Sequence, residues 1–248
     1  MINKTELNRI ALESGLDLYQ QEKDYLLKLF LFYYYKKFDG AVFKGGTCLK
    51  YTLGVERFSE DLDFNIKKVS KFQQEVKEVL QKIRELGIES HFIKEESFAD
   101  SYTCEITFAG PLFDGKAQTR NKFRIDAGYR TGTFLKAQWK LIQSEYPELN
   151  AGFLVLTMHP EEILVEKVAA LFNRKKGRDL YDLWFLINSK IELNKELLQK
   201  KLKKEKIKID FNNICSKEEY ERDMSKLVSR VIPYGQVREA IFKMLDKG

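Results

Sequence analysis

The sequence predicts an α+β protein in which an N-terminal lobe, with a mixed sheet and flanking helices, precedes a C-terminal helical lobe. Two observations lead to this prediction. Strand-like alternation is confined to residues 41–158, and from Glu161 onward the apolar spacing is helical. Hydrophobic residues make up 44% of the 248 positions, enough for a substantial core. We therefore place one lobe at residues 1–160 and the other at residues 161–248.

The N-terminal lobe is predicted to open with two helices. Residues 3–14 and 16–37 have helical spacing, and the second stretch is apolar almost all round, which indicates a central position. Asp39 and Gly40 favour a turn and end this helix. A helix is also predicted at residues 71–86, and residues 110–119 are predicted to form a hairpin loop. Strands are predicted at residues 41–43, around residues 61–64, and at residues 88–94, 102–108, 122–129 and 153–158.

Charge and cysteine content narrow the class of protein. The net charge of +6 fits a polyanionic partner such as RNA. Three widely spaced cysteines form neither a disulfide framework nor a zinc site, so we expect a cytoplasmic protein. No signal-peptide pattern is present, and the most apolar run, residues 26–35, contains Lys28 and is too short to span a bilayer. Neither a Walker A loop nor a Ser/His/Asp arrangement is found.

The segment from Lys44 to Phe64 combines features of a phosphate site and a metal site. Asp61 and Asp63 stand two residues apart in a strand-like stretch, so both carboxylates project from one face, an arrangement that suits Mg²⁺. Gly45 and Gly46 let backbone amides approach an anion, and a helix over residues 47–53 would point its N-terminus at that anion. Metal and phosphate together indicate chemistry on a nucleoside triphosphate. Taken singly, these features also fit a solvated strand face and a turn.

A third carboxylate is predicted on a later strand. Arg124 and Asp126 share one face of the strand at residues 122–129, and Phe123 and Ile125 share the other. We interpret Asp126 as a metal ligand or as the base that deprotonates an attacking hydroxyl. The alternative is a solvent-facing carboxylate or one paired with Arg124.

A second constellation lies in the helical lobe. Lys167, Arg174 and Arg178 are seven and four residues apart and would share one helix face, as would Asp182 if Gly177 did not split the helix. Three cations on one face suit a triphosphate. The alternative is a structural ion-pair network, in which Asp179 and Asp182 pair with the arginines.

These two segments resemble the motifs of the AbiEii/AbiGii-type nucleotidyltransferase toxins. The first is Lys44-Gly45-Gly46-Thr47 followed by residues 57–64, and the second runs from Glu162 to Leu183. The resemblance implies a polymerase-β-like nucleotidyltransferase fold and the toxin half of a bacterial toxin–antitoxin or phage-defence pair. Some relatives add pyrimidine nucleotides to the 3′ acceptor end of tRNA, which blocks aminoacylation. The resemblance also implies a separate antitoxin that carries a winged-helix domain.

We therefore predict a Mg²⁺-dependent transferase that moves a nucleoside monophosphate from an NTP to an RNA acceptor, the tRNA 3′ end foremost. Asp61, Asp63, Asp126 and Lys167 are the predicted catalytic residues, the three aspartates being the metal ligands. Predicted nucleotide contacts are Lys44, Gly45, Gly46, Thr47, Ser59, Lys167, Arg174, Arg178 and Asp182. The alternatives are transfer to a small molecule or protein, and a non-catalytic module that binds nucleotide or RNA.

Overall fold

The computed structural model describes residues 2–129 and 134–246, and its contacts group the chain into two compact units. The first unit, the sheet unit, comprises Met1–Thr52, Glu60–Gly132 and Ala137–Thr157. The second, the helical unit, comprises Leu53–Ser59, Thr133–Lys136 and Met158–Gly248. Two short segments from the first 160 residues thus group with the helices. The division into lobes at residues 160 and 161 stays a prediction.

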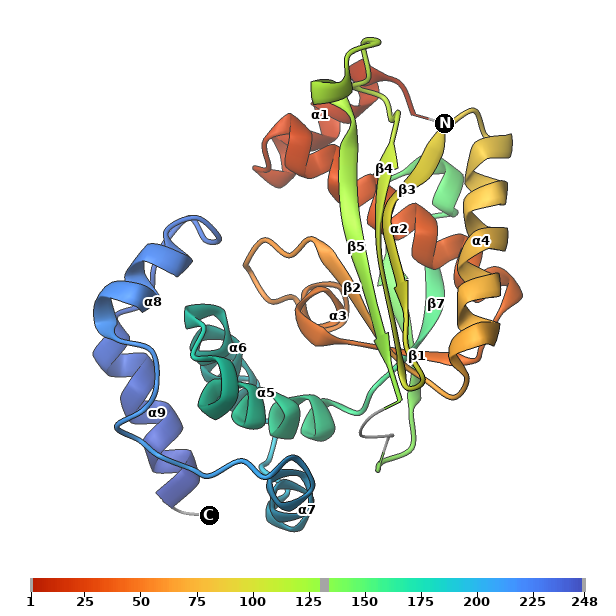
Figure 1. The fold of residues 1–248 in the computed structure, drawn as a ribbon. Coiled ribbons are helices and arrows are strands. Elements are labelled where there is room, and N and C mark those ends of the chain that lie inside the picture. The colour runs from red at the N-terminus through yellow and green to blue at the C-terminus, as the bar shows by residue number, and fades with distance from the viewer. Residues whose placement is uncertain (1, 130–133, 247–248) are drawn as a thin grey trace. The chain divides into compact units, whose positions relative to one another are not determined.

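The sheet unit is built on seven strands in the order β3-β4-β5-β2-β1-β7-β6 (Figure 1). The strands are β1 (Ala41–Lys44), β2 (Asp61–Ile66), β3 (Ser90–Ser97), β4 (Ser101–Phe108), β5 (Asn121–Gly128), β6 (Gln138–Gln143) and β7 (Gly152–Thr157). Its helices are α1 (Lys4–Ser14), α2 (Leu18–Lys37), α3 (Gly45–Leu53) and α4 (Val69–Glu85). The β2·β5 and β1·β7 pairs are parallel and the others antiparallel, so the sheet is mixed as predicted.

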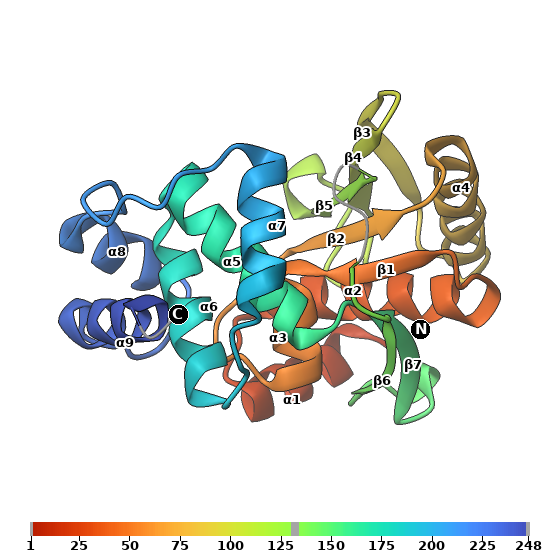
Figure 2. The same cartoon turned by 90° about the horizontal axis from the view of Figure 1, so that it is seen from below.

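An aromatic core joins α2 and α4 to one face of the sheet. Tyr34 of α2 packs against Phe64 of β2 and Phe72 of α4, with ring centroids 5.8 and 5.7 Å away. Phe30 lies edge-on to Phe123 of β5 at 5.9 Å. Figures 1 and 2 both show α4 beside α2. The predicted burial of α2 is confirmed, and its core fixes which way β2 and β5 face.

A buried group of ion pairs and hydrogen bonds around Asp24 connects α2 to α3. The Asp24 carboxylate accepts bonds from Lys50 Nζ at 2.8 Å and from the Tyr51 hydroxyl at 3.0 Å, both on α3. Lys28 Nζ lies 3.2 Å from the same carboxylate, and the Tyr146 hydroxyl donates to it at 3.1 Å. Burial raises the pKa of Asp24, but the charges of Lys50 and Lys28 outweigh burial and lower it. This group fixes the position of α3, the helix at the start of which the glycines lie.

The helical unit contains α5 (Pro160–Arg174), α6 (Gly177–Asn188), α7 (Lys195–Glu205), α8 (Lys217–Met224) and α9 (Tyr234–Asp246). Helix α6 packs against α5, α8 and α9. The chain turns between α5 and α6 because Lys175 adopts a left-handed conformation, with φ of +50°. Gly177 has no room for a side chain, since a Cβ there would lie 3.0 Å from Tyr220 Cα. The segment from Lys167 to Asp182 is therefore two helices, which was the alternative that Gly177 suggested in the sequence.

Several predicted boundaries differ from the structure. The helix predicted at residues 71–86 is α4 at Val69–Glu85, and the strand predicted at residues 88–94 is β3 at Ser90–Ser97. Strand β6 is not predicted by the sequence pattern, because its polar and apolar residues do not mark a buried face. Ser59, a predicted nucleotide contact, precedes β2, which begins at Asp61. Within the described ranges, no helix has the length and apolar character needed to cross a bilayer.

Candidate active site

The strand register brings the three predicted carboxylates to one face of the sheet. In the parallel β2·β5 pair, Asp61 lies opposite Arg124 and Asp63 lies opposite Asp126. Register partners point to the same face, and the alternation of a strand puts Leu62 on the other face, where it is fully buried. All three carboxylates are half-buried. We call the set Asp61, Asp63, Arg124 and Asp126 the carboxylate face.

Gly45 lies directly against the carboxylate face. Its φ is +78°, and a Cβ at this position would lie 2.2 Å from Asp63 Oδ2 and 2.8 Å from Asp63 Cγ. The space that a side chain would need is thus occupied by the Asp63 carboxylate. Gly46 is buried in the first turn of α3, and the Thr47 hydroxyl donates to the Asp61 carbonyl oxygen at 2.6 Å. The start of α3 is thereby joined to the strand that carries both aspartates.

Asp126 is held by two donors. The Thr103 hydroxyl donates to its Oδ1 at 2.7 Å, and an Arg124 guanidinium nitrogen donates to the same oxygen at 2.8 Å. Partial burial lowers the pKa of Arg124, but the hydrogen bond with Asp126 and the charges of Asp126, Asp61 and Asp63 raise it. The pairing with Arg124 is one of the two arrangements that the sequence left open. Thr103, from β4, is a contact that sequence reasoning missed.

The ligand chemistry of this face suits a hard cation. Carboxylate oxygens are the ligands that Mg²⁺ takes in proteins. Within residues 2–129 and 134–246, no three His, Cys, Asp or Glu side chains are gathered as a ready metal-binding group. Both hydrogen bonds to Asp126 go to Oδ1, so Oδ2 is the oxygen that a cation would use. Burial, with a smaller contribution from the Asp63 charge, raises the pKa of Cys48 to about 12, so this thiol stays protonated.

Lys44 continues the carboxylate face onto β1. It lies opposite Asp63 in the antiparallel β1·β2 pair, so the two side chains leave the sheet on the same side. Lys44, Gly45, Gly46 and Thr47 therefore follow one another from the end of β1 into α3, beside Asp63. The backbone N–H groups of a first helical turn have no partner within their own helix, which is why helix starts bind anions.

The helical unit brings Lys167, Arg174 and Asp182 together in one network, which is buried except for Arg174. Lys167 Nζ lies 3.1 Å from Asp179 Oδ1 and 2.8 Å from Asp182 Oδ2. Arg174 donates two bonds of 2.8 Å to Asp179. Arg57, which sequence reasoning did not select, donates two bonds of 2.6 and 2.8 Å to Asp182. We call these five residues the ion cluster.

The pairing of charges explains why Asp179 and Asp182 stay ionised although they are buried. Burial raises the pKa of Asp179 and of Asp182, but the charge of Lys167 and the bonds from the arginines outweigh it, so both values are lowered. Burial likewise lowers the pKa of Arg57, and the charge of Asp182 more than restores it. Asp182 thus pairs with Arg57 and Lys167, as in the structural ion-pair network that the sequence offered as an alternative. Arg178 lies in the first turn of α6, half-buried.

Comparisons with known proteins place this geometry in a family. The sequence of residues 29–244 matches the family of the nucleotidyl transferase AbiEii toxin, a type IV toxin–antitoxin system. The fold is similar to that of MenT4, a nucleotidyltransferase toxin from Mycobacterium tuberculosis H37Rv. The TM-score is 0.68 at 19% identity, over 99% of this chain and 90% of that one. It is also similar to JHP933 from Helicobacter pylori, with a TM-score of 0.63 at 20% identity over 92% of this chain and 90% of that one.

Comparison with curated proteins gave no match. The family match covers most of the chain, and the similar folds agree with the predicted α+β class. The predicted family resemblance is therefore confirmed. The chain belongs to the AbiEii nucleotidyl transferase toxin family of toxin–antitoxin systems and is a nucleotidyltransferase.

Proposed function

We propose that this nucleotidyltransferase moves a nucleoside monophosphate from an NTP to an RNA acceptor, with the 3′ end of tRNA as the acceptor, in a Mg²⁺-dependent reaction. The observation that supports this most is the contact between Asp63 and Gly45 at the start of α3, with Asp126 beside Asp63 in register. A phosphate at the helix start would lie next to a cation held by the carboxylates. The net charge of +6 favours a polyanionic acceptor.

Asp61, Asp63 and Asp126 would hold the magnesium. When bound, the ion supplies charge stabilisation for the triphosphate and lowers the pKa of an attacking hydroxyl. If Asp126 does not bind the ion, its Oδ2 would instead accept the proton of that hydroxyl, because its Oδ1 already accepts two hydrogen bonds. Arg124 keeps the Asp126 side chain in its orientation on β5. The carboxylate face thus provides both a cation site and a proton acceptor.

Backbone and side-chain donors at the start of α3 would bind the triphosphate. Gly45 and Gly46 bring their N–H groups close to it, and Lys44 and Thr47 flank them on either side. Ser59, in the segment that follows α3, is a further proposed phosphate contact. These residues bind and orient the nucleotide and need not change protonation state.

We propose that the ion cluster supplies cationic charge to the nucleotide. Arg57, Lys167 and Arg174 carry three positive charges, and Asp179 and Asp182 carry two negative charges, so one positive charge remains. Lys167, Arg174, Arg178 and Asp182 are the proposed nucleotide contacts of this unit. The side chain of Arg174 is 45% exposed, whereas that of Lys167 is 7% exposed, so Arg174 is the more accessible cation.

The experiment is transfer of label from each of the four α-labelled NTPs to total tRNA, with Mg²⁺ and with EDTA. Asp63→Asn should abolish transfer, and Asp39→Asn, the same change at an exposed aspartate, should not. Removing the last three nucleotides of the tRNA tests the acceptor site. If no NTP labels RNA, or if Asp63→Asn transfers like the wild type, the proposal is wrong. Label that appears instead on a small molecule or on protein would identify that alternative acceptor.

We further propose a separate antitoxin with a winged-helix domain, a role in phage defence, and action in the cytoplasm, where tRNA and NTPs occur. Expression of the chain alone should stop growth, and co-expression of the protein encoded beside it should restore growth. Asp63→Asn should be harmless in the same host. Growth arrest by Asp63→Asn would separate toxicity from transfer and count against this proposal.

A further inference from the structure

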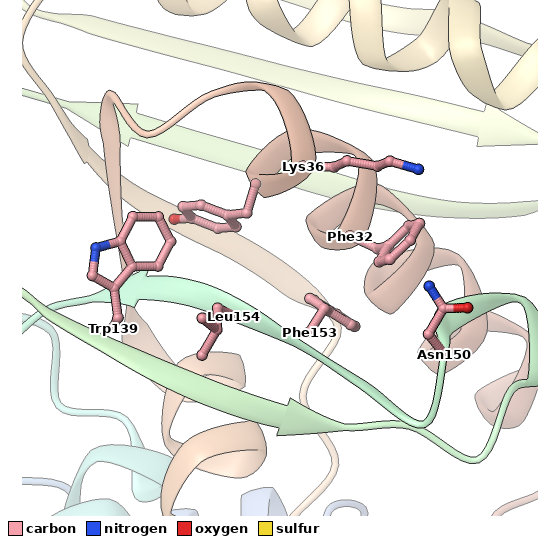
Figure 3. A pocket seen from close by; sticks show the side chains of 7 residues that line it. Phe32, Lys36, Trp139, Asn150, Phe153 and Leu154 are labelled. Atoms are coloured by element: carbon pink, nitrogen blue, oxygen red, sulfur yellow. The ribbon is translucent and has the colours of Figure 1, made fainter.

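An open pocket between α2 and the β6–β7 hairpin is lined mainly by aromatic side chains. Its volume is about 500 Å³, and four of its lining residues are aromatic, Phe32, Tyr35, Trp139 and Phe153. Figure 3 shows Phe32 and Lys36 on α2, opposite Phe153 and Trp139 of the hairpin. The carboxylate face does not include any of these residues. We call this the aromatic pocket.

The rings of the aromatic pocket are fixed against one another while one of them stays accessible. Phe32 and Phe153 lie edge to face at 5.5 Å, and Tyr35 lies edge to face with Trp139 at 6.0 Å. The Tyr35 hydroxyl lies 3.0 Å from the Ala41 carbonyl oxygen and 3.1 Å from that of Leu156, and a hydrogen bond to either one orients its ring. Trp139 nevertheless remains 49% exposed. A half-exposed tryptophan beside immobile rings is a surface on which another flat ring can stack.

Polar groups at the rim point to a charged, hydrogen-bonding ligand. Lys36 Nζ lies 5.5 Å from the Phe32 ring centroid, so a positive charge sits above the aromatic rings. Asn150 lines the pocket and adopts a left-handed conformation with φ of +55°, followed by Ala151 with φ of +60°. These two residues form the turn that leads from the 3-10 helix at Pro147–Leu149 into β7. An apolar ligand would use neither the ammonium group nor the amide.

Stacking rings, one amide and one ammonium are the groups by which proteins bind unpaired nucleotides. Sheet order also relates the pocket to the carboxylate face, because β6 lies three strands from β2. At about 4.8 Å per strand, this separation is about 14 Å across the sheet. At the roughly 3.4 Å rise of a stacked strand, about four nucleotides cover that distance. Four unpaired nucleotides before a 3′ end that reacts at the carboxylate face could therefore extend to the pocket.

We propose that the aromatic pocket binds one unpaired base of the RNA acceptor, with Trp139 stacking on the base and Lys36 neutralising a phosphate. The inference rests on the proposed function in that it takes the acceptor to be RNA. It adds a binding site for the acceptor, apart from the residues that handle the NTP. The site tolerates different bases, because stacking needs only a flat ring.

Binding can be tested without NTP or Mg²⁺, so that catalysis does not enter. The probe is an RNA hairpin with four unpaired 3′ nucleotides, compared with the same hairpin made blunt. In a Trp184→Phe background Trp139 is the sole tryptophan, and its fluorescence should be quenched by the overhang hairpin alone. Trp139→Ala should weaken binding of the overhang hairpin between about 5-fold and 100-fold, the range for one stacked base, and Trp139→Phe should restore most of it.

Leu141→Ala is the matched control, because Leu141 is 57% exposed on the same strand but does not line the pocket. It should bind within twofold of the wild type. Lys36→Gln should lower the slope of log affinity against log salt by about 0.7. Equal binding by Trp139→Ala and the wild type, or by blunt and overhang hairpins, overturns the proposal. Asp63→Asn should bind RNA normally, so a failure of transfer and a failure of the pocket give different results.

Discussion

Gly45→Ala tests whether the place of the Asp63 carboxylate decides activity. The added Cβ would lie 2.2 Å from Asp63 Oδ2 and 2.8 Å from Asp63 Cγ, closer than any ordinary contact. The carboxylate would have to move by roughly 1 Å to restore van der Waals distance. The backbone also carries strain, because alanine at a φ of +78° costs about 1–2 kcal/mol relative to its usual conformations.

These two effects predict different magnitudes in two measurements. A misplacement of about 1 Å in a reacting group can lower the rate on the order of 100-fold. The strain alone should lower the melting temperature by roughly 2–8 °C in a chain of this size. Initial rates of nucleotide transfer at saturating NTP, taken well below the melting temperature, measure the first effect. Thermal unfolding of the same samples measures the second.

Gly87→Ala provides a matched control. Gly87 also has a positive φ, of +86°, but a Cβ there would meet no atom within 4 Å. Its substitution should reproduce the loss of stability and leave the transfer rate unchanged. Transfer by Gly45→Ala at the wild-type rate would show that the position of the Asp63 carboxylate does not decide activity. The reasoning is also refuted if Gly87→Ala loses as much activity, because strain would then explain both results.

Three further predictions concern charges. Asp182→Asn should lower the free energy of unfolding in urea by about 3–5 kcal/mol, because Arg57 and Lys167 lose a buried partner. Because the pKa values of Asp179 and Asp182 are lowered on folding, their stabilisation is complete above the unfolded value of about 3.9. It is lost as pH falls through the folded values, so urea midpoints should drop from about pH 5 downward, and a flat profile would contradict this. Arg124→Gln should tighten Mn²⁺ binding several-fold in calorimetry, since one cation leaves the carboxylate face; unchanged affinity would show that its charge is not felt there.

The sequence predicts which side chains of the candidate site share a strand face. It does not predict which strands pair or which side chains from other strands make contact. Alternation over residues 61–64 and 123–126 is local, so it shows which side chains share a face before any pairing is known. The register that sets Asp63 against Asp126, and the Thr103 bond from β4, depend on how distant strands pair. Strand β6 was missed for a related reason. Its Trp139 side chain is half-exposed, so the strand shows no buried alternation.

The Arg57–Asp182 pair is a clearer case, because its partners are 125 residues apart. No spacing rule connects them, and Arg57 stands four residues before Asp61 in a motif whose aspartates alone indicate a metal site. The sequence did offer one signal. Asp179 and Asp182 lie in α6 among mostly apolar residues, and buried carboxylates need cationic partners. Counting those partners would have prompted a search for an additional arginine.

The geometry of the ion cluster determines how Lys167 could serve a nucleotide. Each carboxylate that Lys167 contacts also holds an arginine through two hydrogen bonds, Asp179 with Arg174 and Asp182 with Arg57. Neither aspartate is left unpaired if the lysine turns to a phosphate, so the exchange avoids the large cost of a bare buried charge. Lys167→Met should therefore cost more free energy in NTP binding, measured by the rise in KM, than in folding, measured by unfolding in urea. Arg57→Met should do the opposite, and equal effects of the two changes would mean that Lys167 only supports the fold.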